Sequence, residues 1–316
     1  MTAAQADVSG ADEHVHRRLQ EIRSAGDLAD LVRITGAEDE HEAYVDAKRE
    51  WAAAMRGVPT PIASAGGLPG TRVVVDGAEF WIHGITHAGT DAEREVLREH
   101  VGRFLDEGET VYCEQGIRPM YFDDLPDVCE MDDYRWAMAE CRKLDAQSRV
   151  ATFRDEGHDG ILEHLLTRAS QFREATFSII DAGSDVYGEA FASAVGDVAS
   201  VFFTGHEDLA IRGEYEAFAR SRRAAENPAK LFDLQAYYAR SFLPQPLERE
   251  WLRRHDPELE ILTHARNERM AAYALSHHDR APAVHLIVGA AHQPGIAYYL
   301  ERYRDDGRPL PFDPVE

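Results

Sequence analysis

Two stretches far apart in the chain place a histidine three residues after a glycine, each at the end of an apolar run. The first is Gly84-Ile-Thr-His87, which ends FWIHGI, and the second is Gly289-Ala-Ala-His292, which ends HLIVG. The spacing alone is a weak signal, because short motifs recur by chance. The shared position is a stronger signal: both histidines lie just past the C-terminal end of a predicted strand, where open α/β sheets bind their ligands.

A carboxylate is expected at the same edge of the sheet. Glu114 ends the predicted strand ETVYCE, which follows the strand before His87 in the same direction. Two imidazoles and a carboxylate are a familiar ligand set for a divalent cation. We therefore predict His87, Glu114 and His292 as ligands of Mn, Co, Zn or Fe. Arg118, four residues after Glu114, can reach back toward this edge and completes the predicted catalytic set.

Two chemical roles remain open for these residues. A bound metal could polarise a carbonyl and lower the pKa of bound water, which is what a metal-dependent hydrolase of amide or ester bonds requires. Alternatively, Glu114 is a general base while His87 and His292 hold the metal or an oxyanion. A different class is a non-catalytic protein that sequesters a peptide, a metal or a haem-like ligand in the same cleft. In a third class, a scaffold, the histidines are vestigial.

Local patterns predict the elements that position these residues. Two apolar runs around Asp76-Gly77 indicate a hairpin, and the second run ends near His87. A helix is expected from Thr90 and Asp91 to Gly108, followed by the strand before Glu114. Strand, helix and strand in this order predict two parallel strands with a right-handed connection. PAVHLIVGAAHQPGIAYYLERY predicts a further strand, turn and helix. The expected fold is α/β, with a mixed sheet that contains parallel βαβ units.

The chain is expected to have two parts. Residues 1–70 are predicted as a helical N-terminal extension that ends in a Pro/Gly-rich linker, VPTPIASAGGLPGT, and residues 71–316 as an α/β domain. Within that domain, residues 131–280 are predicted to be a large, mainly helical insertion. His83 is interpreted as a hydrogen-bonded core histidine, and His285 as a similar case.

Composition limits the classes of partner. The chain has 57 acidic and 34 basic residues, a net charge of −23, and few lysines, which together indicate a salt-adapted, cytoplasmic protein. Such a charge repels nucleic acid and anionic membranes, and no apolar run is long enough for membrane insertion. No Gly-x-Ser-x-Gly or Gly-x-Gly-x-x-Gly motif supports a serine hydrolase or a nucleotide enzyme. The expected partner is a peptide or another small-molecule substrate, and a homodimer is left open.

The motifs taken together resemble the TraB/PrgY family, which is grouped with Tiki proteases and GumN-like proteins and, more remotely, with ChaN and erythromycin esterases. The resemblance is carried by Gly84-Ile-Thr-His87, Glu114-Gln-Gly-Ile-Arg118, Arg266-Asn267 and Gly289-Ala-Ala-His292, in the family's order. It implies an α/β fold with a pseudo-repeated core and a site built from the two histidines and the glutamate. It also implies a peptidase-like, metal-dependent activity of the kind described for Tiki members.

The resemblance extends to a second pair of residues and has clear departures. Arg266 and Asn267 are expected either to contact substrate or to brace the sheet edge. Ile85 stands where the family commonly has threonine, and Thr86 follows it. Residues 1–70 lie outside the shared region, and the C-terminal membrane helices of many archaeal relatives are not expected here. The chain is therefore similar to a soluble, haloarchaeal-type member.

Overall fold

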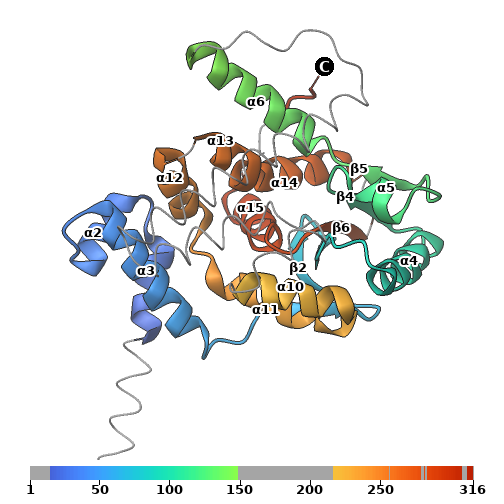
Figure 1. Ribbon diagram of the computed structural model, residues 1–316, viewed down its shortest axis with the longest axis horizontal. Coiled ribbons are helices and arrows are strands. Elements are labelled where there is room, and N and C mark those ends of the chain that lie inside the picture. The colour runs from blue at the N-terminus through green and yellow to red at the C-terminus, as the bar shows by residue number, and fades with distance from the viewer. Residues whose placement is uncertain are drawn as a thin grey trace, which may run out of the picture.

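The computed structural model describes residues 15–148, 216–255, 257–278, 281, 283–307 and 312–315 (Figure 1). A mixed sheet of six strands lies at its centre, in the spatial order β1-β2-β3-β6-β4-β5. The strands are β1 (Ile62–Ala65), β2 (Leu68–Val75), β3 (Ala78–Ile85), β4 (Thr110–Cys113), β5 (Val128–Glu130) and β6 (Ala283–Gly289). The pairs β1–β2 and β2–β3 are antiparallel, whereas β3–β6, β6–β4 and β4–β5 are parallel. The predicted α/β fold with a mixed sheet is confirmed.

The antiparallel end of the sheet consists of two hairpins. Asp76 and Gly77 both have positive φ, as a tight two-residue turn between β2 and β3 requires, so the predicted hairpin is confirmed. The linker predicted over residues 58–71 is wrong in part, because β1 and the start of β2 lie within it. Gly66 and Gly67 form the turn between these strands. Pro69 is tolerated because the β2–β3 pairing begins only at Thr71, so its missing N–H costs no bond to β3.

The parallel part of the sheet is built around β6. The helix α4 (Asp91–Asp106) connects β3 to β4 and begins, as predicted, after Thr90, whose side chain accepts a hydrogen bond from the N–H of Glu93. However, β3 and β4 are not neighbours, since β6 lies between them. All seven residues of β6 are buried, and a strand of this kind is stable only with partners at both edges and cover on both faces.

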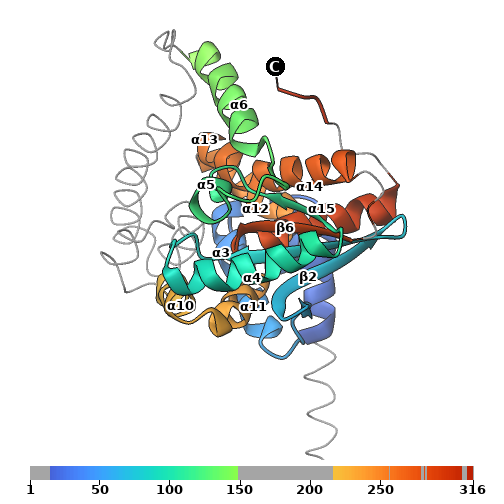
Figure 2. The same cartoon turned by 90° about the vertical axis from the view of Figure 1, so that its right-hand side faces the viewer.

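Helices cover both faces of the sheet (Figure 2). On one face, α4, α10 (Glu216–Glu226) and α11 (Leu231–Ser241) pack against residues such as Ile85 and Ile287. On the other, α14 (Arg266–His277) and α15 (Gln293–Asp306) pack against residues such as Ile82 and Leu286. Adjacent residues of one strand thus belong to two different cores, as the alternation of side chains along a strand requires.

The N-terminal helices share a third core with α12 (Gln245–His255). These helices comprise residues 15–24, α2 (Leu28–Thr35) and α3 (Glu40–Met55). Tyr44 stacks on Trp251, and its hydroxyl donates to the buried carboxylate of Glu248 at 2.6 Å. The ammonium group of Lys48 lies 3.0 Å from the same carboxylate. The helical extension predicted from the sequence therefore packs tightly on the C-terminal half of the chain.

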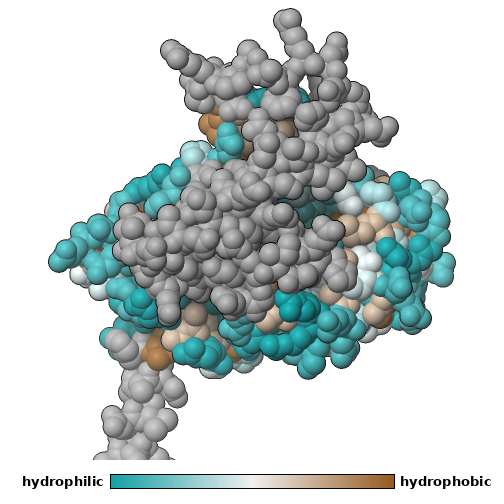
Figure 3. Space-filling model, in the orientation of Figure 1, coloured by the Kyte–Doolittle hydropathy of each residue, from teal (hydrophilic) through white to brown (hydrophobic). Residues whose placement is uncertain are grey.

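Five further helices belong to the described part of the chain. They are α5 (Ile117–Tyr121), α6 (Asp133–Ser148), the 3-10 helix η1 (Pro228–Lys230), α13 (Pro257–Glu260) and the π-helix η2 (Ile261–Ala265). The predicted helical region 131–280 is mainly helical where it is described, and its residues 149–215 lie outside the described residues. Within the described ranges, no helix has the length and apolarity needed to cross a membrane. On the face drawn in Figure 3, hydrophilic residues form most of the described surface.

Candidate functional site

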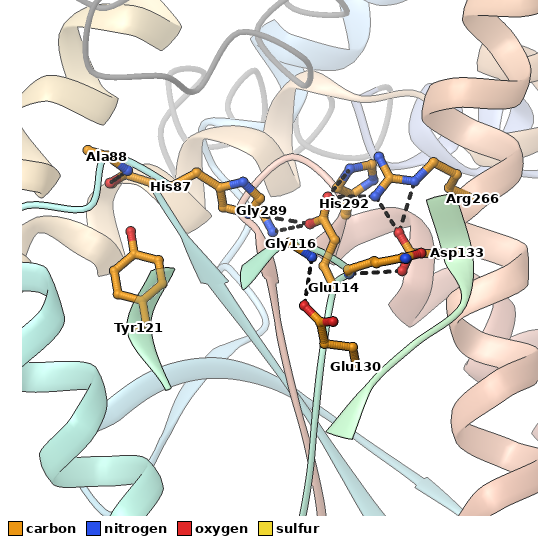
Figure 4. Close-up of polar contacts among 12 residues, drawn as sticks. His87, Ala88, Glu114, Gly116, Tyr121, Glu130, Asp133, Arg266, Gly289 and His292 are labelled. Atoms are coloured by element: carbon orange, nitrogen blue, oxygen red, sulfur yellow. Dashed lines mark hydrogen bonds and ion pairs between the residues drawn. The ribbon is translucent and has the colours of Figure 1, made fainter. Parts of the chain in front are cut away.

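Three strand ends bring His87, Glu114 and His292 together at one edge of the sheet (Figure 4). Glu114 directly follows β4, His87 lies two residues beyond β3, and His292 ends the turn that connects β6 to α15. These three strands run in the same direction, so their C-terminal ends meet. The three side chains that were predicted to converge therefore do so.

Both histidines direct a ring nitrogen at the carboxylate of Glu114. Nε2 of His87 lies 3.3 Å from Oε2, and Nε2 of His292 lies 3.7 Å from Oε1. Among the described residues, neither Nε2 atom has a hydrogen-bond partner. Glu114 and His292 are buried, whereas the His87 side chain is 18% exposed. Both Nε2 atoms therefore face the Glu114 carboxylate without a hydrogen bond.

Gly289 lies at the centre of this arrangement. Its N–H donates to Oε2 of Glu114 at 2.9 Å. A Cβ atom at this position would lie 3.3 Å from Nε2 of His87, 3.5 Å from Oε2 of Glu114 and 3.5 Å from Cδ2 of His292. The point above Gly289 is thus bordered by all three side chains at once. This gives a physical reason for glycine here, because any side chain would fill the position that the three groups surround.

Arg266 braces Glu114 from below the surface. Its guanidinium donates to Oε1 of Glu114 at 2.6 Å and, through Nε, to Oδ2 of Asp133 at 3.0 Å. It also lies over the ring of Tyr134, 3.6 Å from the ring centroid. Oδ1 of Asp133 accepts from the backbone N–H of Gln115, the residue after Glu114. Arg266 and Asp133 together therefore fix the position of both the Glu114 side chain and the backbone that follows it.

A chain of side-chain amides determines the tautomer of His292. Nδ1 of His292 lies 2.7 Å from Oδ1 of Asn267, and the amide of Asn267 donates to Oε1 of Gln245 at 3.0 Å. Because Oδ1 can only accept, Nδ1 of His292 carries the proton and Nε2 keeps its lone pair. Gln245 also lies within hydrogen-bond distance of Nδ1 of His264, on the π-helix η2. An imidazole oriented in this way is the kind that ligates metals.

The charges around the site shift the pKa values of its groups in opposite directions. Burial would raise the pKa of Glu114, but Arg266 and the two histidines outweigh burial and hold it well below its ordinary value. Burial raises the pKa of Asp133 to about 6, against the attraction of Arg266 and with the help of the Glu114 charge. Glu114 is therefore the ionised partner of Arg266 at neutral pH.

The two histidines differ from each other. Burial lowers the pKa of His292 to about 3, although Glu114 attracts the proton, and the charge of Arg266 contributes to the lowering. Burial is also the largest influence on His87 and lowers its pKa, but its interactions with Glu114 and the charge of Glu93 together outweigh burial, and the pKa is raised above its ordinary value. His292 is therefore a neutral imidazole at pH 7, and His87 holds a proton more firmly.

The other predicted site residues have separate outcomes. Arg266 and Asn267 are each 1% exposed, and their partners are Glu114, Asp133 and His292. Their bracing role is present, and a substrate contact stays a prediction. Arg118 does not pair with Glu114, whose arginine partner is Arg266. Arg118 lies on α5 with a buried Nε that has no hydrogen-bond partner within the described chain, and its catalytic role stays a prediction.

His83 and His285 belong to the core, as interpreted from the sequence. Nδ1 of His83 lies 2.9 Å from the carbonyl of Pro69, and its Nε2 lies 3.0 Å from Nδ1 of His285. Nε2 of His285 in turn lies 2.8 Å from Glu109, and its ring stacks on Phe104. The ring nitrogens of these two histidines thus contact each other, the carbonyl of Pro69 and the carboxylate of Glu109.

Sequence reasoning missed the residues that support the three groups. Asp133 reads as the first residue of an exposed helix, and Gln245 as part of a polar helix start. Glu93 reads as an ordinary acidic residue in the first turn of α4, although it is completely buried. The one available signal was that Asp133 closely follows the short strand β5, where site residues of parallel sheets gather.

The residues fit a divalent cation in kind. The rings of His87 and His292 and the ionised carboxylate of Glu114 border the point above Gly289, and Asn267 orients the His292 ring. Among the described residues, Nε2 of each ring has no hydrogen-bond partner. In the ranges that the structure describes, no group of three or more His, Cys, Asp or Glu residues is already arranged to hold a metal ion, so binding would require the side chains to adjust. No protein-family model, curated protein or solved structure matches this chain.

Proposed function

We propose that the chain is a metal-dependent hydrolase of an amide or ester bond, with a peptide or another small molecule as substrate. One observation carries the proposal: two imidazole rings and an ionised carboxylate, from three distant parts of the chain, surround the position above Gly289, and among the described residues neither ring's Nε2 atom has a hydrogen-bond partner. The resemblance to Tiki-like peptidases points to the same activity. The proposed setting is a salt-adapted cytoplasm, in keeping with the net charge of −23.

In this proposal the side chains have distinct tasks. His87, Glu114 and His292 would hold Mn, Co, Zn or Fe, which when bound supplies polarisation of a carbonyl and a lower pKa of bound water. Arg266 keeps Glu114 ionised and directed at the site. Asn267 keeps the lone pair of His292 at Nε2. His87 is the one partly exposed group of the three, so a substrate would approach the site from the side on which His87 lies.

A second candidate is a protein that binds a peptide, a metal or a haem-like ligand without turnover. It is favoured by the contacts of Glu114, because Oε1 already accepts from Arg266 and Oε2 from the N–H of Gly289. A carboxylate with both oxygens engaged is a weaker base than a free one. Such a site would retain a ligand more readily than it would activate water.

Metal analysis tests the proposal. Protein purified after supply with Mn, Co, Zn or Fe should carry stoichiometric metal, and His87→Ala and His292→Ala should lose it. His100→Ala is the matched control, since His100 lies on α4 with its Nδ1 on the carbonyl of Val96. A wild-type protein that takes up none of these metals would overturn the metal-dependent mechanism.

Turnover separates the enzyme from the binding protein. A library of peptides and esters should be cleaved by the wild type, and Glu114→Gln should abolish cleavage. Metal-dependent tight binding of a library member without any cleavage would favour the second candidate instead.

A further inference from the structure

The loop between β3 and α4 holds His87 in an unusual backbone conformation. His87 has a φ of 59°, in the left-handed region that residues with a side chain rarely adopt. Such a conformation costs on the order of 1 kcal/mol or more and persists only where the surroundings enforce it. The residues on both sides of His87 show what enforces it here.

A buried carboxylate anchors the start of this loop. Glu93 is 0% exposed and accepts three hydrogen bonds: from the N–H of Thr86 at 2.7 Å, from the Thr86 hydroxyl at 2.8 Å and from the Tyr121 hydroxyl at 2.6 Å. No lysine, arginine or histidine nitrogen lies within 4 Å of it in the described part of the chain. A buried carboxylate without a cation is costly, so a set of donors that converges on it is a specific arrangement.

The same two partners of Glu93 also fix the end of the loop. The Tyr121 hydroxyl, which donates to Glu93, accepts from the N–H of Gly89 at 2.9 Å. The Thr86 hydroxyl accepts from the N–H of Ala88 at 3.2 Å. The backbone N–H groups on both sides of His87 are thus bound to one small network. In Figure 4 the Tyr121 ring lies beside this loop, and the His87 ring extends away from it, toward Gly289.

We propose that Glu93 and Tyr121 are positioning residues that hold the His87 imidazole at the site. The inference rests on the proposed function only in taking His87 as a functional group, since the positioning exists without metal or substrate. A purely structural junction would be served as well by apolar side chains, which are often as stable as a buried charge or more so. The network is instead built of polar groups that bind backbone on both sides of a single histidine.

The experiment compares three variants of the metal-free protein by NMR of histidine-labelled samples. The His87 imidazole signals are assigned from their loss in His87→Ala. Tyr121→Phe removes only the hydroxyl, and Glu93→Gln replaces the carboxylate by an amide whose NH₂ cannot accept from Tyr121. Tyr299→Phe is the matched control. Tyr299 lies on α15, is also buried, and its hydroxyl accepts a hydrogen bond from Arg249 of α12 at 2.8 Å.

In Tyr121→Phe and Glu93→Gln we expect the His87 imidazole signals to shift and broaden, and the Gly89 amide to exchange on the order of tenfold faster. In Tyr299→Phe both should stay as in the wild type, at a similar loss of stability. The proposal is overturned if Tyr121→Phe folds and its His87 signals keep their wild-type positions and widths. A wild-type protein that binds no metal would remove the proposed function and leave this result standing, because no metal is present in the measurement.

Discussion

Replacing Arg266 with methionine is expected to destabilise the fold severely. In the described ranges, no other lysine or arginine nitrogen lies within 4 Å of Glu114 or of Asp133. Both carboxylates are almost wholly buried. Methionine keeps much of the apolar length of the side chain and removes the charge. The change therefore isolates the electrostatic part of the brace.

The magnitude follows from the cost of a buried carboxylate without its cation. Such a group takes up a proton. For a carboxyl group with an ordinary pKa near 4, protonation at pH 7 costs about 1.36 kcal/mol for each pH unit between the pKa and the solution pH, or roughly 4 kcal/mol in total. Backbone N–H groups still reach both carboxylates, at 2.9 Å for Glu114 and 3.0 Å for Asp133. We therefore expect the cost of one group rather than two. A loss of about 4 kcal/mol agrees with the range of about 3–5 kcal/mol for breaking a buried ion pair.

Urea unfolding at pH 7, with a chelator present, measures this loss. Arg269→Met is the control: it lies one turn further along α14 and pairs with Asp132, whose side chain is 17% exposed. That variant should lose roughly 1–2 kcal/mol, since water still reaches the carboxylate. Adding Asp133→Asn to Arg266→Met should cost less than the sum of the single changes, by about 1.5 kcal/mol or more. Equal losses for the two arginine variants, or strict additivity, would refute the reasoning.

Three further predictions concern the site and the core. Gly289→Ala should reduce metal affinity at least tenfold, because the Cβ of the alanine would lie among the three site groups. The free energy of unfolding should change by only about 1 kcal/mol. A metal titration that matches that of the wild type would contradict this prediction. Asn267→Leu should weaken metal binding by about 10–100-fold, because the tautomer of His292 is no longer fixed, and calorimetric titration checks it. Burial lowers the pKa of His83 to about 3 and that of His285 to about 4. As the pH falls below about 6.5, both histidines are therefore protonated in the unfolded chain and stay neutral in the folded protein. The free energy of unfolding should then drop by about 1.4 kcal/mol per pH unit for each of the two histidines. His83→Gln should remove one such slope in urea unfolding between pH 6.5 and 4, and parallel profiles would count against it.

The parts of the site that could be predicted from the sequence depend on local signals. Apolar runs that end in glycine locate the ends of β3 and β6, and the helix start at Thr90 gives the connection to β4. Parallel strands place the residues after them at one edge, so His87, Glu114 and His292 could be grouped without a structure. The order of the strands could not, since the insertion of β6 between β3 and β4 depends on pairing across about 200 residues of chain.

The supporting residues could not be predicted, because their burial is a tertiary property. Glu93 and Asp133 stand in the first turns of α4 and α6, where acidic residues usually face solvent and interact with the helix dipole. Only the packed structure shows that one accepts from Thr86 and Tyr121 and the other from Arg266. The prediction of a linker over residues 58–71 was wrong in part for a related reason. Glycine and proline weaken a strand in general, yet the outer hairpin has them at its turn and near the strand end.

The two Gly-x-x-His motifs are alike in sequence and unlike in chemistry. His292 ends its turn with a φ of −77°, at the N-terminus of α15, and donates from Nδ1 to Asn267, so burial leaves it neutral with a free lone pair. His87 is held with a φ of 59° and lies partly exposed beside Glu114, so its pKa is raised. At neutral pH His292 therefore offers its lone pair directly, whereas His87 must first release a proton before it can bind a cation. The glycines differ in the same sense: a Cβ at Gly84 would meet the backbone of Ala290 at 2.7 Å, whereas a Cβ at Gly289 would enter the site.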